Sequence, residues 1–288
     1  MSLLLALLLQ VGPNPTLDTL PRADDPLINR PPPRRARVTR DPVVEARTIN
    51  PSSGWLQSCL DQIDADPARA HSMAQIRRTE VTGVDAVLAN LCLGTAAVQL
   101  GRWNEAREAF IAAREDTPTT EPATRARFAA MAGNAAFEAR DSAAALSLLA
   151  EAREDARKGK AQVIEAIALT DTARVLVAGG REEAALSALS QATQIAPDRA
   201  EGWLLYATLL RRLDRLTDAQ AAIERAAERA PKNPEVGLEA GVIAVLDGRD
   251  EAARSSWQSV ITLDPDSPFA ETARGYLAQL AGEEEDAP

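Results

Sequence analysis

The chain has 288 residues, and its 42 acidic and 32 basic side chains give a formal net charge of −10 at pH 7. This charge argues against a protein that binds duplex nucleic acid, because such proteins carry a basic surface. One histidine and two distant cysteines supply too few ligands for a metal site, and we expect no cofactor.

The first segment, residues 1–11, is an apolar run that contains Leu3–Leu9. It is too short to span a bilayer, which takes about 20 apolar residues, and it is similar to the hydrophobic region of a secretory signal. No basic residue precedes it and no small-residue cleavage site follows it. We expect a periplasmic or envelope-associated protein; the alternative is an apolar N-terminus of a cytoplasmic protein.

Residues 12–50 are rich in proline and arginine and have no apolar periodicity. This composition predicts a disordered linker. Arg34, Arg35 and Arg37 could contact an acidic membrane surface or a partner, although a solvated linker is the favoured interpretation. The C-terminal residues 282–288 form an acidic tail, for which we also expect solvation.

Residues 51–86 are expected to form a divergent pair of capping helices, Trp55–Ile63 and Asp66–Arg78. Asp66 stands before Pro67, as Asp264 stands before Pro265. Each aspartate is therefore a predicted helix N-cap.

Three prolines then stand 34 residues apart: Pro197, Pro231 and Pro265. Each follows a run of small and large residues, such as Ala219, Ile223 and Ala226. A period of this length indicates an array of helix-turn-helix units. The same frame fits five units: 87–120, 126–159, 166–199, 200–233 and 234–267. The residues between units, 121–125 and 160–165, are expected to lengthen two connections.

In the unit that ends at Pro231, the first helix shows Trp203, Tyr206, Ala207 and Leu210 before the alanine run. This order resembles the tetratricopeptide repeat. Small residues recur at one slot and large residues at another: Gly94, Gly133, Ala173, Ala207 and Gly241, opposite Phe110, Leu149, Leu189, Ile223 and Trp257. The resemblance implies an all-α fold, a right-handed α-solenoid of stacked antiparallel helix pairs, closed by a capping helix at 268–281.

Cys59 and Cys92 are the only cysteines. In the family, the first helices of consecutive pairs lie side by side, which would place the two sulfurs on facing surfaces. An exported chain would then carry a Cys59–Cys92 disulfide. The alternative is two buried free thiols.

No arrangement of residues predicts catalysis. His71 has no nucleophile and acid arranged around it, as a catalytic triad would need. No glycine-rich phosphate-binding loop is present either. We therefore expect no enzyme and no small-molecule substrate.

The resemblance implies a concave groove, lined by the first helix of each pair, that receives a protein or peptide. Its predicted partner-binding residues are Asn134, Phe137, Arg174, Leu204, Thr208, Arg211 and Arg212. An alternative is that the three arginines pair with acids of adjacent units, namely Glu138, Glu201 or Glu235. The expected function is a non-catalytic scaffold, or else an accessory or regulatory subunit of an envelope enzyme or secretion machinery.

Overall fold

A computed structural model describes residues 51–285 of the chain, with side chains for residues 54–281. These residues form thirteen α-helices and no β-strand. They divide into two compact units, 51–175 and 176–285, and the boundary falls within one helix. The predicted signal-like segment 1–11 and linker 12–50 lie outside the described residues.

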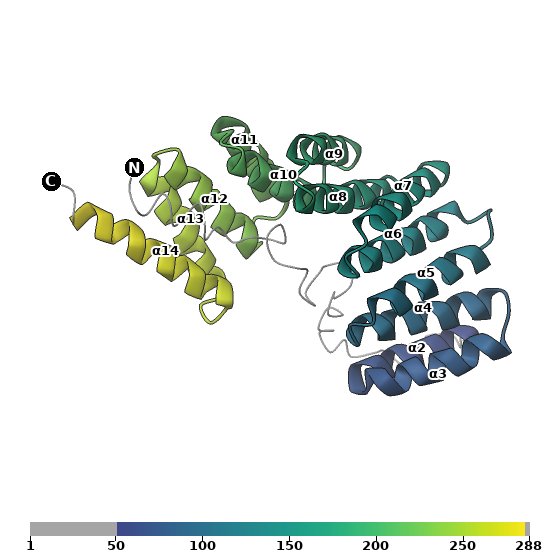
Figure 1. Cartoon of the computed structure of the whole chain (residues 1–288). Helices are drawn as coiled ribbons and strands as arrows, with labels where there is room; N and C mark the ends of the chain where they lie inside the picture. Colours follow the sequence, from purple (N-terminus) through teal and green to yellow (C-terminus); the bar gives the residue numbers. More distant parts are fainter. Residues whose placement is uncertain (1–50, 286–288) are drawn as a thin grey trace, which may run out of the picture. The chain divides into compact units, whose positions relative to one another are not determined.

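The N-terminal unit is built of helices joined by short turns (Figure 1). They are α2 (Pro51–Ala65), α3 (Pro67–Glu80), α4 (Val84–Gln99), α5 (Trp103–Asp116), α6 (Pro122–Glu138), α7 (Ser142–Lys158) and most of α8 (Gln162–Ala178). From α2 to α7 each helix packs against the next, and α2 also packs against α4.

The C-terminal unit continues with the same kind of element. Its helices are α9 (Glu182–Ile195), α10 (Ala200–Arg212), α11 (Leu216–Arg229), α12 (Pro234–Leu246), α13 (Asp250–Leu263) and α14 (Pro268–Glu285). Each again packs against the next, while α12 also contacts α10 and α14. The predicted all-α helical-repeat solenoid is thus confirmed.

Three helices are longer than the repeat frame suggests. The intervals 121–125 and 160–165 do not lengthen connections, because most of their residues form the first turns of α6 and α8. Pro122 stands in the first turn of α6, where proline suits a helix, and Val163 and Ile164 extend the apolar face of α8. At the C-terminus, α14 extends to Glu285, beyond the predicted end of the capping helix at 281.

One of the two predicted N-caps is present. The Asp66 carboxylate accepts a hydrogen bond from the backbone N–H of Arg69 at 3.1 Å and caps α3. Asp264 instead ends α13, and α14 begins four residues later, at Pro268. The hydroxyl of Ser267 accepts the Ala270 N–H at 3.1 Å, so the serine next to the helix, and not Asp264, caps α14.

Glycines allow the two helices of a pair to approach closely. A Cβ added at Gly94 would overlap the ring of Phe110, and one at Gly241 would overlap Trp257. At Gly133 the added atom would lie 2.8 Å from Cγ of Leu149. These are the small and large slots of the sequence pattern, so close approach is the physical reason for the glycines.

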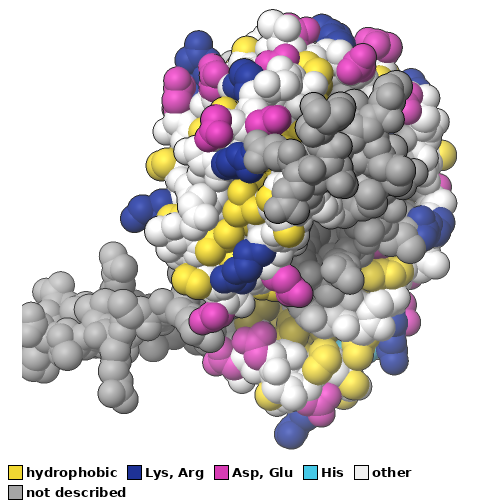
Figure 2. All heavy atoms as spheres, turned by 90° about the vertical axis from the view of Figure 1, so that its left-hand side faces the viewer, with side chains coloured by type: hydrophobic (Ala, Val, Ile, Leu, Met, Phe, Trp, Pro, Cys, Tyr) yellow, Lys and Arg dark blue, Asp and Glu magenta, His cyan; other side chains and the backbone are white. Residues whose placement is uncertain are grey.

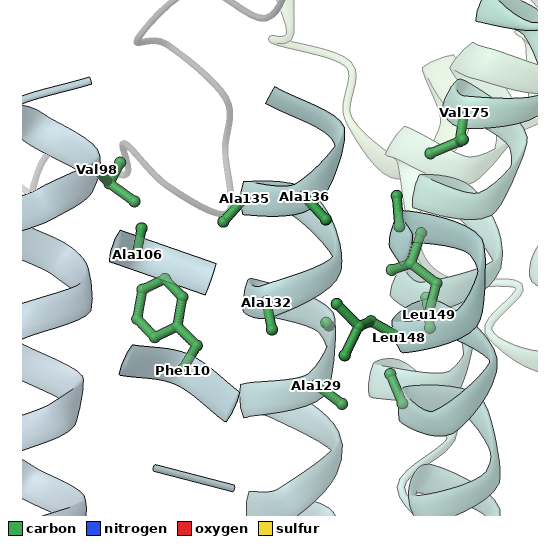
Figure 3. Packing of buried hydrophobic residues seen from close by; sticks show 14 of the residues in the cluster. Val98, Ala106, Phe110, Ala129, Ala132, Ala135, Ala136, Leu148, Leu149 and Val175 are labelled. Atoms are coloured by element: carbon green, nitrogen blue, oxygen red, sulfur yellow. The ribbon is translucent and has the colours of Figure 1, made fainter. Parts of the chain in front are cut away.

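The apolar core follows the helices as a row of clusters. In the N-terminal unit, Figure 3 shows Phe110 of α5 between α4, which carries Val98, and α6, which carries Ala132. In the C-terminal unit, the ring of Trp257 packs against that of Tyr276 with centroids 5.1 Å apart. Among the helices of residues 51–285, none combines the length and the apolar character needed to cross a bilayer.

Candidate functional site

A pocket of about 450 Å³ opens in the N-terminal unit, among α4, α5, α6 and α8. We call it the N-terminal pocket. Its lining residues are Thr95, Val98, Phe110, Arg127, Ala130, Met131, Asn134, Val163, Ile164 and Ile167. Seven of these ten side chains are hydrophobic, so the pocket presents a mainly apolar surface.

The helical period explains why these side chains meet. Along α8 the apolar residues Val163, Ile164 and Ile167 follow at successive spacings of one and three, which places them on one face of the helix. On α6, Arg127, Ala130 and Asn134 follow at spacings of three and four, which also share a face. The pocket is therefore made mainly by the facing sides of first helices in successive pairs, with Phe110 of α5 also in its wall.

Two polar groups in the pocket already have partners within the fold. The Thr95 hydroxyl donates to the carbonyl oxygen of Leu91 at 2.8 Å. The amide nitrogen Nδ2 of Asn134 donates to Oδ2 of Asp171 at 3.1 Å, and both side chains are buried. The walls of the pocket consequently offer contacts mostly through carbon atoms.

The structure brings Asn134 and Arg174 together through one buried carboxylate. Nη1 of Arg174 donates to Oδ1 of Asp171 at 2.8 Å, and Asp171 is only 1% exposed. The acid is three residues before the arginine on the same helix and is none of the three glutamates considered as partners. Phe137, also on the predicted surface, is half-buried and packs against the core cluster.

The other predicted groove residues belong to the C-terminal unit. Leu204 and Thr208 are buried, and the threonine hydroxyl donates to the leucine carbonyl oxygen at 3.0 Å. Nε of Arg211 donates to Oε1 of Glu239 at 2.6 Å, and both side chains are buried. Arg212 is exposed. The role of all these residues in partner binding stays a prediction.

Several of the residues that define the pocket were not among the predicted binding residues. Val163 and Ile164 fall in an interval that we expected to be a connection. The spacing of apolar residues between Val163 and Ile167 was a usable signal, because it is typical of a helix face. Asp171 precedes Arg174 by three residues, which is also a recognisable helical ion-pair spacing. The Arg211–Glu239 pair joins two helices and gave no comparable local signal.

The cysteines lie at the N-terminal end of the array. Cys59 on α2 and Cys92 on α4 have their sulfurs at disulfide distance, and the two Cα atoms are 6.4 Å apart. Neither side chain is exposed, and both belong to a cluster that includes Ile63, Ala70 and Leu93. The facing arrangement implied by the repeat resemblance is therefore present.

His71 joins two helix pairs. It is 6% exposed, and its Nε2 lies 2.7 Å from Oε2 of Glu105 at the start of α5. Its contact therefore links α3 to α5. Within residues 54–281, no three His, Cys, Asp or Glu side chains gather as candidate metal ligands.

Basic and acidic side chains are mixed on one face of the molecule. On the face shown in Figure 2, Lys and Arg lie between Asp and Glu, with hydrophobic side chains exposed among them. Several ion pairs are formed within one helix or turn, such as Arg215 with Asp218 at 2.8 Å. Such exposed pairs contribute little to stability.

Comparison with known proteins identifies the repeat. Residues 176–241 match the tetratricopeptide repeat family model. No curated protein sequence is significantly similar to the chain. Among solved structures, Pseudomonas aeruginosa pilF has 14% identity and a TM-score of 0.57, with 78% of this chain and 96% of pilF covered.

A second similar structure is the assembly chaperone of RpL4, Acl4. It has 18% identity and a TM-score of 0.56, and the comparison covers 83% of this chain and 99% of Acl4. At these identities the likeness concerns the fold alone. Residues 176–241 thus match the tetratricopeptide repeat, and both units are built of helices joined by short turns.

Proposed function

We propose that the protein is a non-catalytic scaffold that binds a protein or peptide partner through the exposed side of its first helices. The observation that carries this proposal is the N-terminal pocket, a preformed apolar hollow between successive helix pairs. Helix repeats commonly use such extended surfaces for binding. Acl4, which has a similar fold, is by its name an assembly chaperone of another protein, and this supports a protein partner.

Site-specific photo-crosslinking in the native host tests the proposal. A photoreactive phenylalanine analogue at Val163, in the pocket, should crosslink a discrete partner. The same analogue at Val84 serves as the matched control, because Val84 is an equally aliphatic, exposed residue of the same unit outside the pocket. Equal crosslinking from both positions, or none from Val163, would argue against pocket-mediated binding.

The identity of the crosslinked partner also decides between the two forms of the function. A partner with enzymatic activity, whose rate changes when the pocket is altered, would make the chain an accessory or regulatory subunit. A partner without such activity would leave the chain as a docking scaffold.

We further propose that the protein works in the bacterial cell envelope. Two observations support this location: the apolar segment Leu3–Leu9 and the pair Cys59 and Cys92 at disulfide distance, since disulfides persist in oxidising compartments. Residues 1–50 fused to a phosphatase that is active only outside the cytoplasm should give activity. An inactive fusion retained inside the cell would place the protein in the cytoplasm.

A further inference from the structure

We propose that the N-terminal pocket selects a short partner segment in which two or three large apolar side chains stand next to an aspartate or glutamate. This inference rests on the proposed scaffold function and specifies the chemistry of its partner. It depends on two independent features of the pocket: an uncovered apolar surface and a cation that the fold leaves available.

The first feature is the exposure of large aliphatic side chains in a concave place. Val163 is 53% exposed, and Ile167 and Met131 are partly exposed beside it. A volume of about 450 Å³ lies within the range of pockets that enclose small ligands. It can therefore accommodate a few side chains of leucine size. Covering this surface would remove apolar area from water, which favours an apolar occupant.

The second feature is Arg127, the charged residue in the lining. Arg127 is exposed and forms no ion pair with any residue between 54 and 281. Its neighbour one half-turn earlier, Arg125, is already used: its Nη1 donates to the carbonyl oxygens of Arg114 and Thr117 at 2.7 and 2.9 Å. The nearby carboxylate of Asp171 is likewise engaged by Asn134 and Arg174.

The available charge at the pocket is therefore positive, in a chain whose net charge is −10. A guanidinium can bind a carboxylate through two parallel hydrogen bonds. A basic segment would instead meet Arg127 with a like charge. Charge complementarity thus selects an acidic residue next to the apolar anchors and disfavours a basic one.

The test begins with random twelve-residue peptides displayed on phage and selected on the full chain. Enriched peptides should carry apolar residues such as Leu, Ile, Met or Phe within four positions of Asp or Glu. The affinity of a labelled consensus peptide is then measured by fluorescence polarisation for the wild type and its variants. An absence of enrichment, or enrichment of basic peptides, would overturn the inference.

Four variants provide matched comparisons. Val163→Asp and Arg127→Glu should each weaken the consensus peptide about tenfold or more, the effect of losing one good apolar or charge-assisted contact. Val84→Asp and Arg69→Glu make the same changes at exposed residues of the same unit outside the pocket, and should leave affinity within about twofold. Equal losses in pocket variants and controls would contradict the assignment.

Exchanging the charges of Arg127 and of the acidic peptide residue tests their contact most directly. The consensus peptide with its acid replaced by lysine should bind Arg127→Glu better than it binds the wild type. Failure of this exchange would show that Arg127 does not contact the acidic residue of the peptide.

Circular dichroism and melting temperature verify that each variant folds. Val163 is in the first turn of α8, where an aspartate suits the helix dipole, and Val163→Ala supplies a milder second variant.

The outcomes for this inference and for the scaffold function are distinguishable. If Val163 crosslinks a partner in the host but the selected peptides lack acids or bind Val163→Asp normally, the scaffold function stands and the partner chemistry is wrong. If neither crosslinking nor peptide selection depends on the pocket, both proposals fail.

Discussion

Glycines inside helices differ in how closely a neighbouring helix packs against them. A Cβ at Gly94 would overlap the Phe110 ring, whereas one at Gly275, inside α14, would meet no atom within 4 Å. The same change from glycine to alanine therefore has opposite consequences at the two positions. In one case steric overlap dominates, and in the other the helix propensity of the backbone dominates.

We predict that Gly94→Ala lowers the free energy of unfolding by about 1–3 kcal/mol, the usual cost of overpacking a core. Gly275→Ala should raise it by about 0.5–1 kcal/mol, because alanine is the better helix former. Urea unfolding of both variants measures the two effects. Stabilisation by Gly94→Ala would mean that α4 and α5 can separate without loss, contrary to the packing described.

Buried arginine–carboxylate pairs are the second residue-scale feature. Arg211 and Glu239 are 4% and 0% exposed, and each charge needs the other because water cannot solvate it. Arg174 and Asp171 form a similar pair in the N-terminal unit. These arginines therefore have a structural task, whatever they contribute to binding.

Glu239→Gln should destabilise the fold by about 3–5 kcal/mol, because it leaves the Arg211 guanidinium buried without a counter-charge. The double variant Arg211→Met, Glu239→Leu should recover most of that loss, since apolar groups of similar size carry no desolvation cost. Asp218→Asn, which breaks the exposed pair with Arg215, serves as the control and should have a much smaller effect. Equal losses in Glu239→Gln and Asp218→Asn would contradict the buried pair.

At the scale of helices, α2 and α4 are connected by the cysteine pair. Closing a loop between residues 33 positions apart restricts the unfolded chain, which is worth about 3–4 kcal/mol in the chain-entropy model. A bond between two helices that already pack together would hold α2, the first helix of residues 51–285, against α4.

We predict that Cys59→Ser, Cys92→Ser and the double variant lower the melting temperature of the oxidised protein by the same amount. The reason is that either single change removes the entire bond. Mass spectrometry under non-reducing conditions should find the two cysteine peptides linked. Additive losses in the double variant would show two independent thiols that fill core space.

The packing of α14 against α13 and α12 is expected to become less stable at alkaline pH. Burial, followed by the nearby Glu239 carboxylate, raises the pKa of Tyr276 to about 12. The unfolded tyrosine loses its proton near its ordinary pKa of about 10. Since the folded pKa is raised, the stabilisation is complete below pH 10 and is lost as the pH rises toward 12.

The free energy of unfolding should thus decline between about pH 10 and 12, and that of Tyr276→Phe, which cannot ionise at this position, should decline less. The difference between the two proteins in urea unfolding at several pH values isolates the effect. Identical pH profiles would mean that the phenol has the same pKa in the folded and unfolded chain.

At the scale of the whole molecule, the repeats make stability local. Each helix contacts chiefly its neighbours in sequence, and the core is a series of clusters without a common centre. In such arrays the stability is approximately a sum of repeat and neighbour terms. A local change need not be felt along the entire chain.

We therefore expect Gly94→Ala to increase amide hydrogen exchange in α4 and α5, and in the adjoining α3 and α6, while α12 and α13 keep their wild-type rates. Hydrogen exchange followed by mass spectrometry measures this helix by helix. A uniform increase over both units would indicate a single cooperative fold instead.

The sequence by itself determined the helical class, the repeat and the small and large slots of its packing. All three depend on neighbours within about 34 residues, and glycine, alanine and proline restrict the backbone directly. Gly94 opposite Phe110 could therefore be predicted before any coordinates. The resemblance to the tetratricopeptide repeat implied that Cys59 and Cys92 lie on facing helices, because in that family the first helices of consecutive pairs are adjacent.

Only the tertiary structure decided which charges are satisfied and where a hollow remains. Arg211 and Arg127 look alike in the sequence, yet the first is buried against Glu239 and the second is exposed at a pocket. Burial and pairing depend on how residues of different helix pairs meet in space, and no periodicity encodes that distance. For the same reason, the interval 160–165 could be taken for a connection until its apolar residues were seen to form a wall of the pocket.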